Sequence, residues 1–403
     1  MISINFLLDI AIILLSTKAL GLITKKVHMP QVVGALLAGI IFGPAMLNLV
    51  HETEFISNLS ELGVIVLMFA AGIETDIKEL KKCGKASFII ALIGVIVPLL
   101  GGYIVASVYT GDWGISNLAS PAFLRNVFIG VILTATSVSI TVETLQELGK
   151  LKTSSGTAIM GAAVIDDIMG IVILTIITGT ADSNVNLAVV LLKIAAFFVF
   201  AGICGFIFYK AFNWLCITQG QKRRIPIMAF VFCLLLAFIS EEWFGVADIT
   251  GAYAAGIVLA NTIHSKYISQ KFEVVSYMLL SPIFFAAVGL KITVTSMDKN
   301  MIIFTGVLLL VAVLTKVIGC GLGAKMCGYS KDESLKIGIG MISRGEVALI
   351  VANKGASVGL MEDKFFAPII LIVIITTLVT PILLKIVYSK KNYKHNEPTG
   401  IAI

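Results

Sequence analysis

The sequence predicts an all-α polytopic membrane protein with about thirteen transmembrane helices. The composition, the length of the apolar runs and the placement of basic residues between those runs support this prediction. Of the 403 residues, 58% are hydrophobic and 13% are charged, and the mean hydropathy is +1.00. A soluble domain carries about 25% charged residues, so the composition indicates a chain embedded in a membrane.

The apolar runs set the number of spans. A helix needs about 20 mostly apolar residues to cross the hydrocarbon core of a bilayer. The eighth and ninth runs are short because Glu241, Glu242 and Asp248 interrupt them. The thirteen predicted spans are 4–24, 30–50, 57–73, 86–110, 124–143, 154–180, 185–211, 226–242, 246–263, 274–292, 300–322, 334–357 and 364–388.

The chain has a net charge of +6, and the placement of its basic residues indicates how the chain is oriented in the membrane. Lysines and arginines concentrate in alternate loops, such as 78–85 and 222–224, whereas the loops between these are poorer in them and hold several acids. By the positive-inside rule, this pattern predicts an outside N-terminus and a cytoplasmic C-terminus in an inner or plasma membrane. We therefore expect the lipid bilayer, and no nucleic acid, as a partner.

The remaining sequence signals are negative. The six cysteines show no paired spacing and the four histidines are scattered, so we expect neither disulfides nor a metal cluster, and no cofactor. The N-terminal segment lacks the basic region of a cleaved signal peptide and is interpreted as the first span.

Two spans are predicted to be interrupted helices. The fifth contains LTATSVSIT (residues 133–141), and the twelfth contains GMISRGEVALI (residues 340–350), with polar or charged groups at mid-membrane depth. Freed backbone groups at this depth must find partners inside the protein. The two spans lie seven apart and so cross the membrane in opposite directions. Paired broken helices in inverted repeats indicate a secondary transporter with its site at the midplane.

Two adjacent aspartates, Asp166 and Asp167, occupy the middle of the sixth span in GAAVIDDIMG. A charged side chain there costs at least ~2.5–3.5 kcal/mol on insertion scales, and such groups are usually functional. Neighbouring helical residues do not face the same way, so two roles are more natural than one. One carboxylate could face a water-filled path and exchange a cation for protons, because burial and a nearby cation shift its pKa in opposite directions. The other could be held by a fixed countercharge. The alternative is a pair that serves only helix packing.

Lys316 is the candidate countercharge, because it lies far from both ends of the eleventh span. The alternative for Lys316 is a lysine that extends to the membrane interface. In the twelfth span, Arg344 and Glu346 could neutralise the charged ends of half-helices. We favour this supporting role over direct contact with an ion.

The hydroxyl groups of Thr134, Thr136 and Ser137 are candidate oxygen ligands for a dehydrated monovalent cation. The alternative is that these side chains bond back to their own helix. Their position one span before the aspartate pair favours a place near the ion.

The three motifs TATSVSIT, GAAVIDDIMG and SRGEVALI, in this order, resemble the monovalent cation:proton antiporters. The similarity extends over essentially the whole chain and is greatest to the NapA-type Na⁺/H⁺ antiporters of the Kef/NapA branch. The resemblance implies a NhaA/NapA-like fold, in which a core domain moves like an elevator against a dimerisation domain. It also implies a homodimer.

The resemblance assigns roles to individual residues. Asp167 looks like the carboxylate that binds Na⁺ or H⁺, and Asp166 looks like the partner of Lys316. Thr134 to Ser137 resemble the unwound segment near the ion, and Arg344 and Glu346 the charge-compensating residues. The Asp-Asp pair, in place of Asn-Asp, points to electrogenic exchange. The expected transporter unit is residues 1–388, with a core domain of 57–180 and 274–388, scaffold spans of 1–50 and 185–263, and a cytoplasmic tail of 389–403.

The predicted function is exchange of Na⁺, or Li⁺, for H⁺, and the chain is not expected to be an enzyme. The main alternative is a transporter of the same fold and mechanism that exchanges K⁺ for H⁺. The choice of ion depends on the geometry of the cavity, which the sequence does not give. An intramembrane aspartyl protease would need two aspartates on separate facing helices, which Asp166 and Asp167 do not provide. A channel with an acidic ring would show no obligatory proton coupling.

Overall fold

The computed structural model describes residues 5–26, 29–113, 120–181, 187–219, 224–291, 298–357 and 359–389. Within these ranges all regular secondary structure is helical. In chain order the elements are α1 (Asn5–Lys26), α2 (Gln31–Phe42), α3 (Glu54–Glu74), α4 (Ile77–Thr110), α5 (Pro121–Thr134), α6 (Val138–Glu147), α7 (Ser154–Ala181), α8 (Leu187–Gln219), α9 (Arg224–Glu242), α10 (Asp248–Ala260), α11 (Ser265–Val275), the π-helical turn η1 (Ser276–Leu280), α12 (Ser281–Leu290), α13 (Lys299–Met326), α14 (Lys331–Gly340), α15 (Glu346–Ser357), the 3₁₀ turn η2 (Asp363–Phe365) and α16 (Phe366–Ser389).

The span count agrees with the sequence. Among the described residues, ten helical stretches are long and apolar enough to cross a membrane, and α2 and α10 are shorter apolar helices. With the broken pair α14 and α15 they account for the thirteen predicted spans, so the predicted all-helical polytopic membrane fold is confirmed. Prolines confine α2, because Pro30 precedes it and Pro44 follows it, and neither has an N–H to continue a helix.

The helix α4 begins at Ile77, well before the predicted start at residue 86. Asp76 explains the difference, because its side chain accepts hydrogen bonds from the backbone N–H groups of Lys78, at 2.8 Å, and Glu79. A carboxylate at this position satisfies donors that a helix start leaves open. The basic stretch after the third span therefore forms the first turns of α4.

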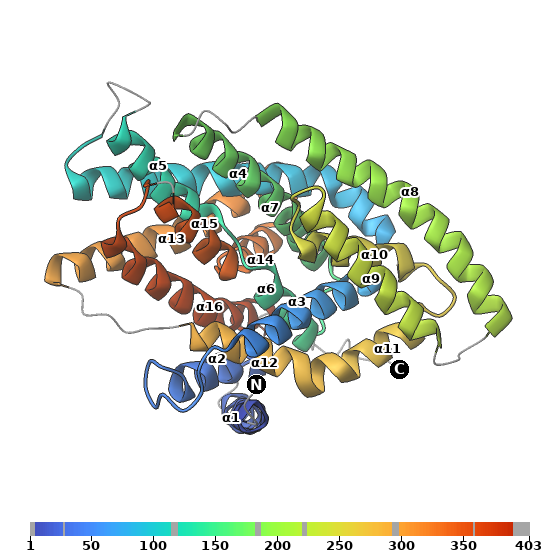
Figure 1. Ribbon diagram of the computed structural model, residues 1–403. Coiled ribbons are helices and arrows are strands. Elements are labelled where there is room, and N and C mark those ends of the chain that lie inside the picture. Colours follow the sequence, from blue (N-terminus) through green and yellow to red (C-terminus); the bar gives the residue numbers. More distant parts are fainter. Residues whose placement is uncertain are drawn as a thin grey trace, which may run out of the picture.

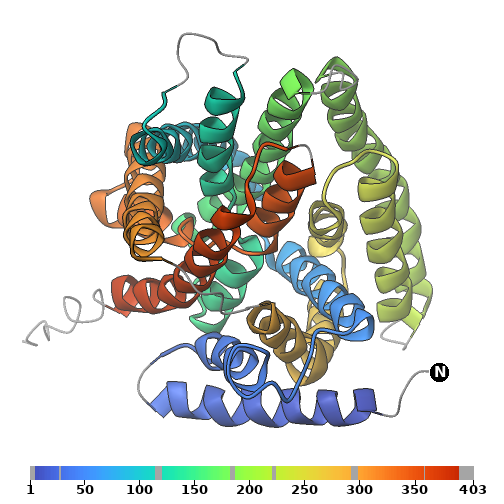
Figure 2. The ribbon, with the colours of Figure 1, turned by 60° about the vertical axis from the view of Figure 1, so that its left-hand side comes forward.

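The helices pack in two groups. In the first helix group, α3 packs against α10, α11 and α12, α2 against α1 and α12, and α9 against α10 and α11. In the second helix group, α4 packs against α5, α7 and α13, α13 packs against α14 and α16, and α6 packs against α7 and α16. Figure 2 shows α1 lying across one side of the molecule, next to α2 and away from α4, α5 and α13. The helix α8 touches α7 of the second group and α9 and α10 of the first.

The helix α6 of the broken span α5–α6 lies near the centre of the molecule and α8 at its edge (Figure 1). In the most apolar window of each, 89% of the residues are buried in Pro121–Glu147 and 17% in Ala188–Trp214. The exposed residues of α8 are largely apolar and include Leu192 and Ile203. Large exposed apolar faces mark membrane contact, so α8 faces lipid, whereas α5–α6 is enclosed by protein.

The crossing of α2 with α12 depends on Gly39. A Cβ atom at Gly39 would lie 2.0 Å from the carbonyl oxygen of Ala286 and 2.9 Å from the Cα of Gly289. We expect Gly39→Ala to destabilise the protein by about 1–3 kcal/mol, since backbone must shift to admit the methyl group. The matched control is Gly84→Ala in α4, where a Cβ atom would have no neighbour within 4 Å among the described residues beyond its own stretch of helix, and there we expect a gain of about 0.5–1 kcal/mol. Thermal unfolding in detergent measures both, and equal melting temperatures for the two variants would contradict this packing.

Candidate functional site

Two interrupted helices cross at the centre of the structure. The break between α5 and α6 covers residues 135–137, and the break between α14 and α15 covers residues 341–345. The backbone N–H of Ser137 donates to the carbonyl of Ser343 at 2.7 Å, and the Ser343 hydroxyl donates to the carbonyl of Ser137 at 2.8 Å. Thr141 donates to the carbonyl of Gly340 at 2.7 Å. The two breaks therefore satisfy each other's freed backbone groups, as buried irregular backbone in a membrane requires.

Arg344 is fully buried beside this crossing and binds carbonyl groups. Its Nη1 donates to Ile342 at 2.7 Å, and its Nη2 donates to Leu133 at 2.8 Å and to Ala312 at 2.9 Å. Leu133 lies at the C-terminal end of α5, which carries the negative end of that half-helix dipole. The arginine thus offsets the charge of α5 and links it to α13. Glu346 begins α15, but its side chain lies outside the described residues.

Lys316 and Asp166 form a buried ion pair between α13 and α7. The ammonium group lies 3.1 Å from both carboxylate oxygens of Asp166. The two side chains are 0% and 1% exposed, so Lys316 does not extend to the membrane interface. The Thr136 hydroxyl, from the break after α5, neighbours the same carboxylate. A charge pair, a hydroxyl and the Arg344 guanidinium thus meet at the crossing.

Asp167 is also buried, with 8% of its surface exposed. It lies beside Asp166 in α7, and successive residues of an α-helix point about 100° apart. The two carboxylates therefore have different surroundings within one turn. Thr134 donates back to its own helix, to the carbonyl of Val131 at 2.7 Å, and Ser137 is part of the crossing itself. Of the three predicted hydroxyl ligands, Thr136 is the one whose side chain the structure places beside Asp166.

Several site residues were missed by the sequence reasoning. Thr141 and Ser343 hydrogen bond to each other at 2.9 Å, and Thr377 of α16 donates to the carbonyl of Arg344 at 2.5 Å. All three hydroxyl groups are buried at the crossing. In the sequence each of them is only a hydroxyl residue in an apolar run, and a Ser or Thr that bonds back to its own helix looks the same.

A cavity of about 850 Å³ lies between α6 and the first helix group. From α6 it is lined by Glu143, Gln146 and Glu147, and across from them by residues of α1, α2, α3, α11, η1 and α12. Glu74 and Glu273 add two further carboxylates, and Lys18 adds an ammonium group. The charged groups of this cavity are therefore mainly acidic, and we refer to it as the acidic cavity. It borders the C-terminal half of the broken span.

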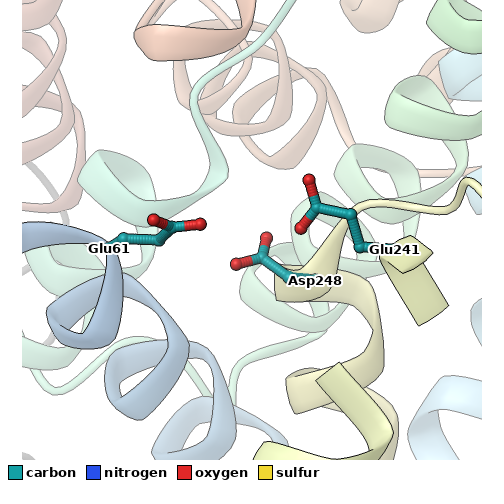
Figure 3. Close-up of side chains that lie close together, drawn as sticks. All are labelled: Glu61, Glu241 and Asp248. Atoms are coloured by element: carbon teal, nitrogen blue, oxygen red, sulfur yellow. The ribbon is translucent and has the colours of Figure 1, made fainter. Parts of the chain in front are cut away.

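Three more carboxylates converge elsewhere, where α3, α9 and α10 meet (Figure 3). The oxygens of Glu61, Glu241 and Asp248 all lie within 4.8 Å of one another, and two of the three residues are exposed. The sequence prediction that excluded a metal cluster considered histidines and cysteines and did not consider this group. Exposed carboxylates of this kind are common without a bound ion, and no role is assigned to this cluster.

Two half-helix breaks that cross in a polytopic bundle, beside a buried charge pair, define a secondary transporter of cations or anions. Residues 11–390 match the family described as "Sodium/hydrogen exchanger, transmembrane". The chain belongs to this family of monovalent cation:proton antiporters.

Individual relatives support this assignment. The chain is 40% identical to the Na⁺/H⁺-K⁺ antiporter GerN of Bacillus cereus, covering 96% of this chain and 97% of that protein. It is 34% identical to a Na⁺/H⁺ antiporter of Enterococcus hirae, covering 96% and 99%. The solved sodium proton antiporter MjNhaP1 from Methanocaldococcus jannaschii is similar in fold, with a TM-score of 0.69 at 18% identity over 97% of this chain and 99% of that one. These proteins are transporters rather than enzymes, and the chain is a multi-pass membrane antiporter like them.

Proposed function

We propose that the protein exchanges Na⁺, or Li⁺, for H⁺ across the membrane by alternating access, with both ions competing for Asp167. The observation that carries this proposal is the buried Lys316–Asp166 pair next to Asp167, at the crossing of the broken helices. Asp167 is buried next to this pair on α7, and ionisable side chains deep in a membrane span are usually functional. We therefore assign the variable cargo to Asp167.

Competition at one carboxylate is sufficient for exchange. A carboxylate holds either a proton or a metal cation, and hard oxygen ligands suit Na⁺ once it has lost its water. The ion pair with Lys316 holds the neighbouring Asp166 ionised. Asp167 therefore binds the exchanged ion, while Asp166 binds Lys316. We propose that Lys316 leaves Asp166 when the cation binds and returns when protons replace it. In this cycle, Na⁺ binding releases one proton from Asp167 and a second proton from Lys316, and both protons are taken up again when Na⁺ leaves. Two protons then cross the membrane for each Na⁺, which makes the exchange electrogenic.

Arg344 and Glu346 are proposed to support the site rather than to bind the ion. The Arg344 guanidinium is engaged by three carbonyl groups, which supports a fixed structural part. Thr136 is proposed as an ion ligand, together with carbonyl groups of the break that Thr134 and Ser137 flank. This placement keeps the ligand oxygens next to the two aspartates.

The moving unit is proposed to be the second helix group, and the scaffold to be the first. The packing of α3 and α12 against α2 and α10 supports placing both of them in the scaffold. This division departs from the boundaries expected from the sequence, which put residues 57–73 and 274–292 in the core domain. The site on α7 and α13, with its crossing helices, then moves as one body past the scaffold. By resemblance, we propose a homodimer formed through the scaffold.

The orientation is proposed from the loop charges. Lysines and arginines concentrate on the side where α6 and α7 are joined, at Lys150 and Lys152. The positive-inside rule then places this side in the cytoplasm and the N-terminus outside. We therefore propose that the acidic cavity bordered by Glu143 and Glu147 opens toward the cytoplasm.

A second candidate is exchange of K⁺ for H⁺ on the same fold. The relative named as a Na⁺/H⁺-K⁺ antiporter favours it, at 40% identity over nearly the whole chain. The ligand oxygens suit both cations chemically, and the two differ in the size of cavity that they fill.

Proteoliposomes with a trapped pH dye test both candidates. An acidic interior is established, and Na⁺, Li⁺ and K⁺ are then added in turn outside. We expect Na⁺ and Li⁺ to dissipate the pH gradient, and an imposed membrane potential to change the rate because the exchange moves net charge. A response to K⁺ alone would select the second candidate, and no response to any of the three cations would overturn both.

A further inference from the structure

The N-terminus of α2 is capped by a side chain from another part of the fold. The backbone N–H of Gln31 donates to both carboxylate oxygens of Glu147, each at 2.9 Å. Within its own segment α2 has no cap, because Pro30 makes no side-chain hydrogen bond and the first turn contains no acidic residue. The carboxylate of Glu147 therefore supplies both a hydrogen-bond acceptor and a negative charge at the positive end of the α2 dipole.

This bond joins the two helix groups. Glu147 is the last residue of α6, in the second group, and Gln31 is the first residue of α2, in the first group. The two helices otherwise touch only sparsely. Both residues line the acidic cavity that separates α6 from the first helix group. A relative movement of the groups would therefore break this bond at the cavity wall.

Electrostatics favour the bond in the present conformation. Glu143 lies one helical turn before Glu147 on α6, and like charges at this spacing repel. Glu74 and Glu273 line the same cavity, so the charged groups on its wall are mainly carboxylates. The ammonium of Lys18 is engaged by the hydroxyl and the ring of Tyr277. The amide of Gln31 is the donor that the structure gives to Glu147.

We propose that the Glu147–Gln31 bond is a latch between the two helix groups, which stabilises the conformation in which the acidic cavity is formed. The proposal rests on the proposed function, because it assumes that the second group moves against the first. Releasing the latch leaves the α2 N-terminus without its cap and shifts the equilibrium toward the opposite conformation. Loss of a helix cap corresponds to about a fivefold shift in a two-state equilibrium.

Three variants distinguish an effect of the Glu147–Gln31 hydrogen bond from an effect of the negative charge of Glu147. Glu147→Gln removes the charge, and Glu147→Asp keeps the charge but shortens the reach of the carboxylate. Gln31→Pro removes the donor itself at the first helical position, where proline is well tolerated. The preceding Pro30 already has an extended backbone, with φ −58° and ψ 148°, as a residue before proline requires. The matched control is Glu79→Gln, an exposed carboxylate that pairs with Lys82 inside α4.

The conformational equilibrium is measured by electron spin resonance distances in lipid nanodiscs. Spin labels are placed on Lys81→Cys in α4 and Lys266→Cys in α11, both exposed, in a chain whose six native cysteines are replaced. We expect two populations whose ratio shifts about fivefold in Glu147→Gln, Glu147→Asp and Gln31→Pro, and not in Glu79→Gln. The double variant Glu147→Gln with Gln31→Pro should equal either single variant, since both remove one bond.

Three outcomes would overturn the latch. They are an unchanged ratio in every variant, additive shifts in the double variant, and a shift with Glu147→Gln but with neither Glu147→Asp nor Gln31→Pro. The third outcome would assign Glu147 a role through its charge in the cavity. The distance measurement requires no ion transport, so a failure of cation-driven proton flux would count against the proposed function and leave the latch to be judged separately.

Discussion

Replacing Asp167 with asparagine is expected to abolish exchange, with Na⁺-driven proton flux falling to that of protein-free liposomes. The amide cannot take up or release a proton, and it lacks the negative charge that would hold a monovalent cation. Flux is measured with the pH dye in proteoliposomes at matched protein content. Because Asp167 is buried, removing its charge is not expected to lower the melting temperature, so a loss of flux would not reflect unfolding.

Two controls sharpen this expectation. Asp167→Glu keeps a carboxylate within one methylene of its place, and we expect it to retain part of the flux with altered apparent cation affinity. Glu79→Gln removes an exposed carboxylate on α4 and is expected to leave the flux unchanged. Normal flux in Asp167→Asn would show that the cation and the proton do not share this carboxylate, and the competition mechanism would be wrong.

The sequence contained enough information to predict the spans and the pairing of Lys316 with Asp166. Apolar runs of membrane length and the alternation of loop charges identified the thirteen elements. A lysine in the middle of an apolar run was sufficient to single out Lys316, because an unpaired ammonium there is expensive. The breaks at 135–137 and 341–345 were visible as polar residues at mid-span depth. Each of these features lies within one short stretch of sequence and involves a large free-energy cost of placing polar or charged groups in the membrane. A single sequence is therefore sufficient to reveal it.

The features that were not predictable depend on contacts between distant segments. Arg344 binds carbonyl groups 32 and 211 residues away in the chain, at Ala312 and Leu133. Glu147 caps a helix that begins 116 residues earlier. The helices α3 and α12 pack with α2 and α10, although their position in the sequence next to core spans suggested otherwise. Nothing in a single sequence fixes which apolar faces meet, so packing of this kind requires the three-dimensional arrangement.

Replacing Lys316 with methionine is expected to destabilise the protein by about 3–5 kcal/mol, because it leaves the Asp166 carboxylate buried without its countercharge. The ammonium contacts both carboxylate oxygens at 3.1 Å, and the side chain of Asp166 is 1% exposed. Because both side chains are buried, water cannot replace the Lys316 ammonium as the countercharge of Asp166. The expected result is a marked fall in melting temperature in detergent, which thermal unfolding measures directly.

The double variant Asp166→Asn with Lys316→Met tests whether the cost comes from the broken pair. Removing both charges leaves no uncompensated ion, so most of the lost stability should return. Lys299→Met, an exposed lysine in the first turn of the same helix, is the matched control and should melt like the unaltered protein.

If Lys316→Met alone melted like this control, the ion pair would contribute nothing to stability. If the double variant stayed as unstable as Lys316→Met, the loss would arise from the packing of the lysine stem. Recovery in the double variant, together with loss of voltage dependence in its exchange, would tie the charge pair to both the stability and the electrogenic step.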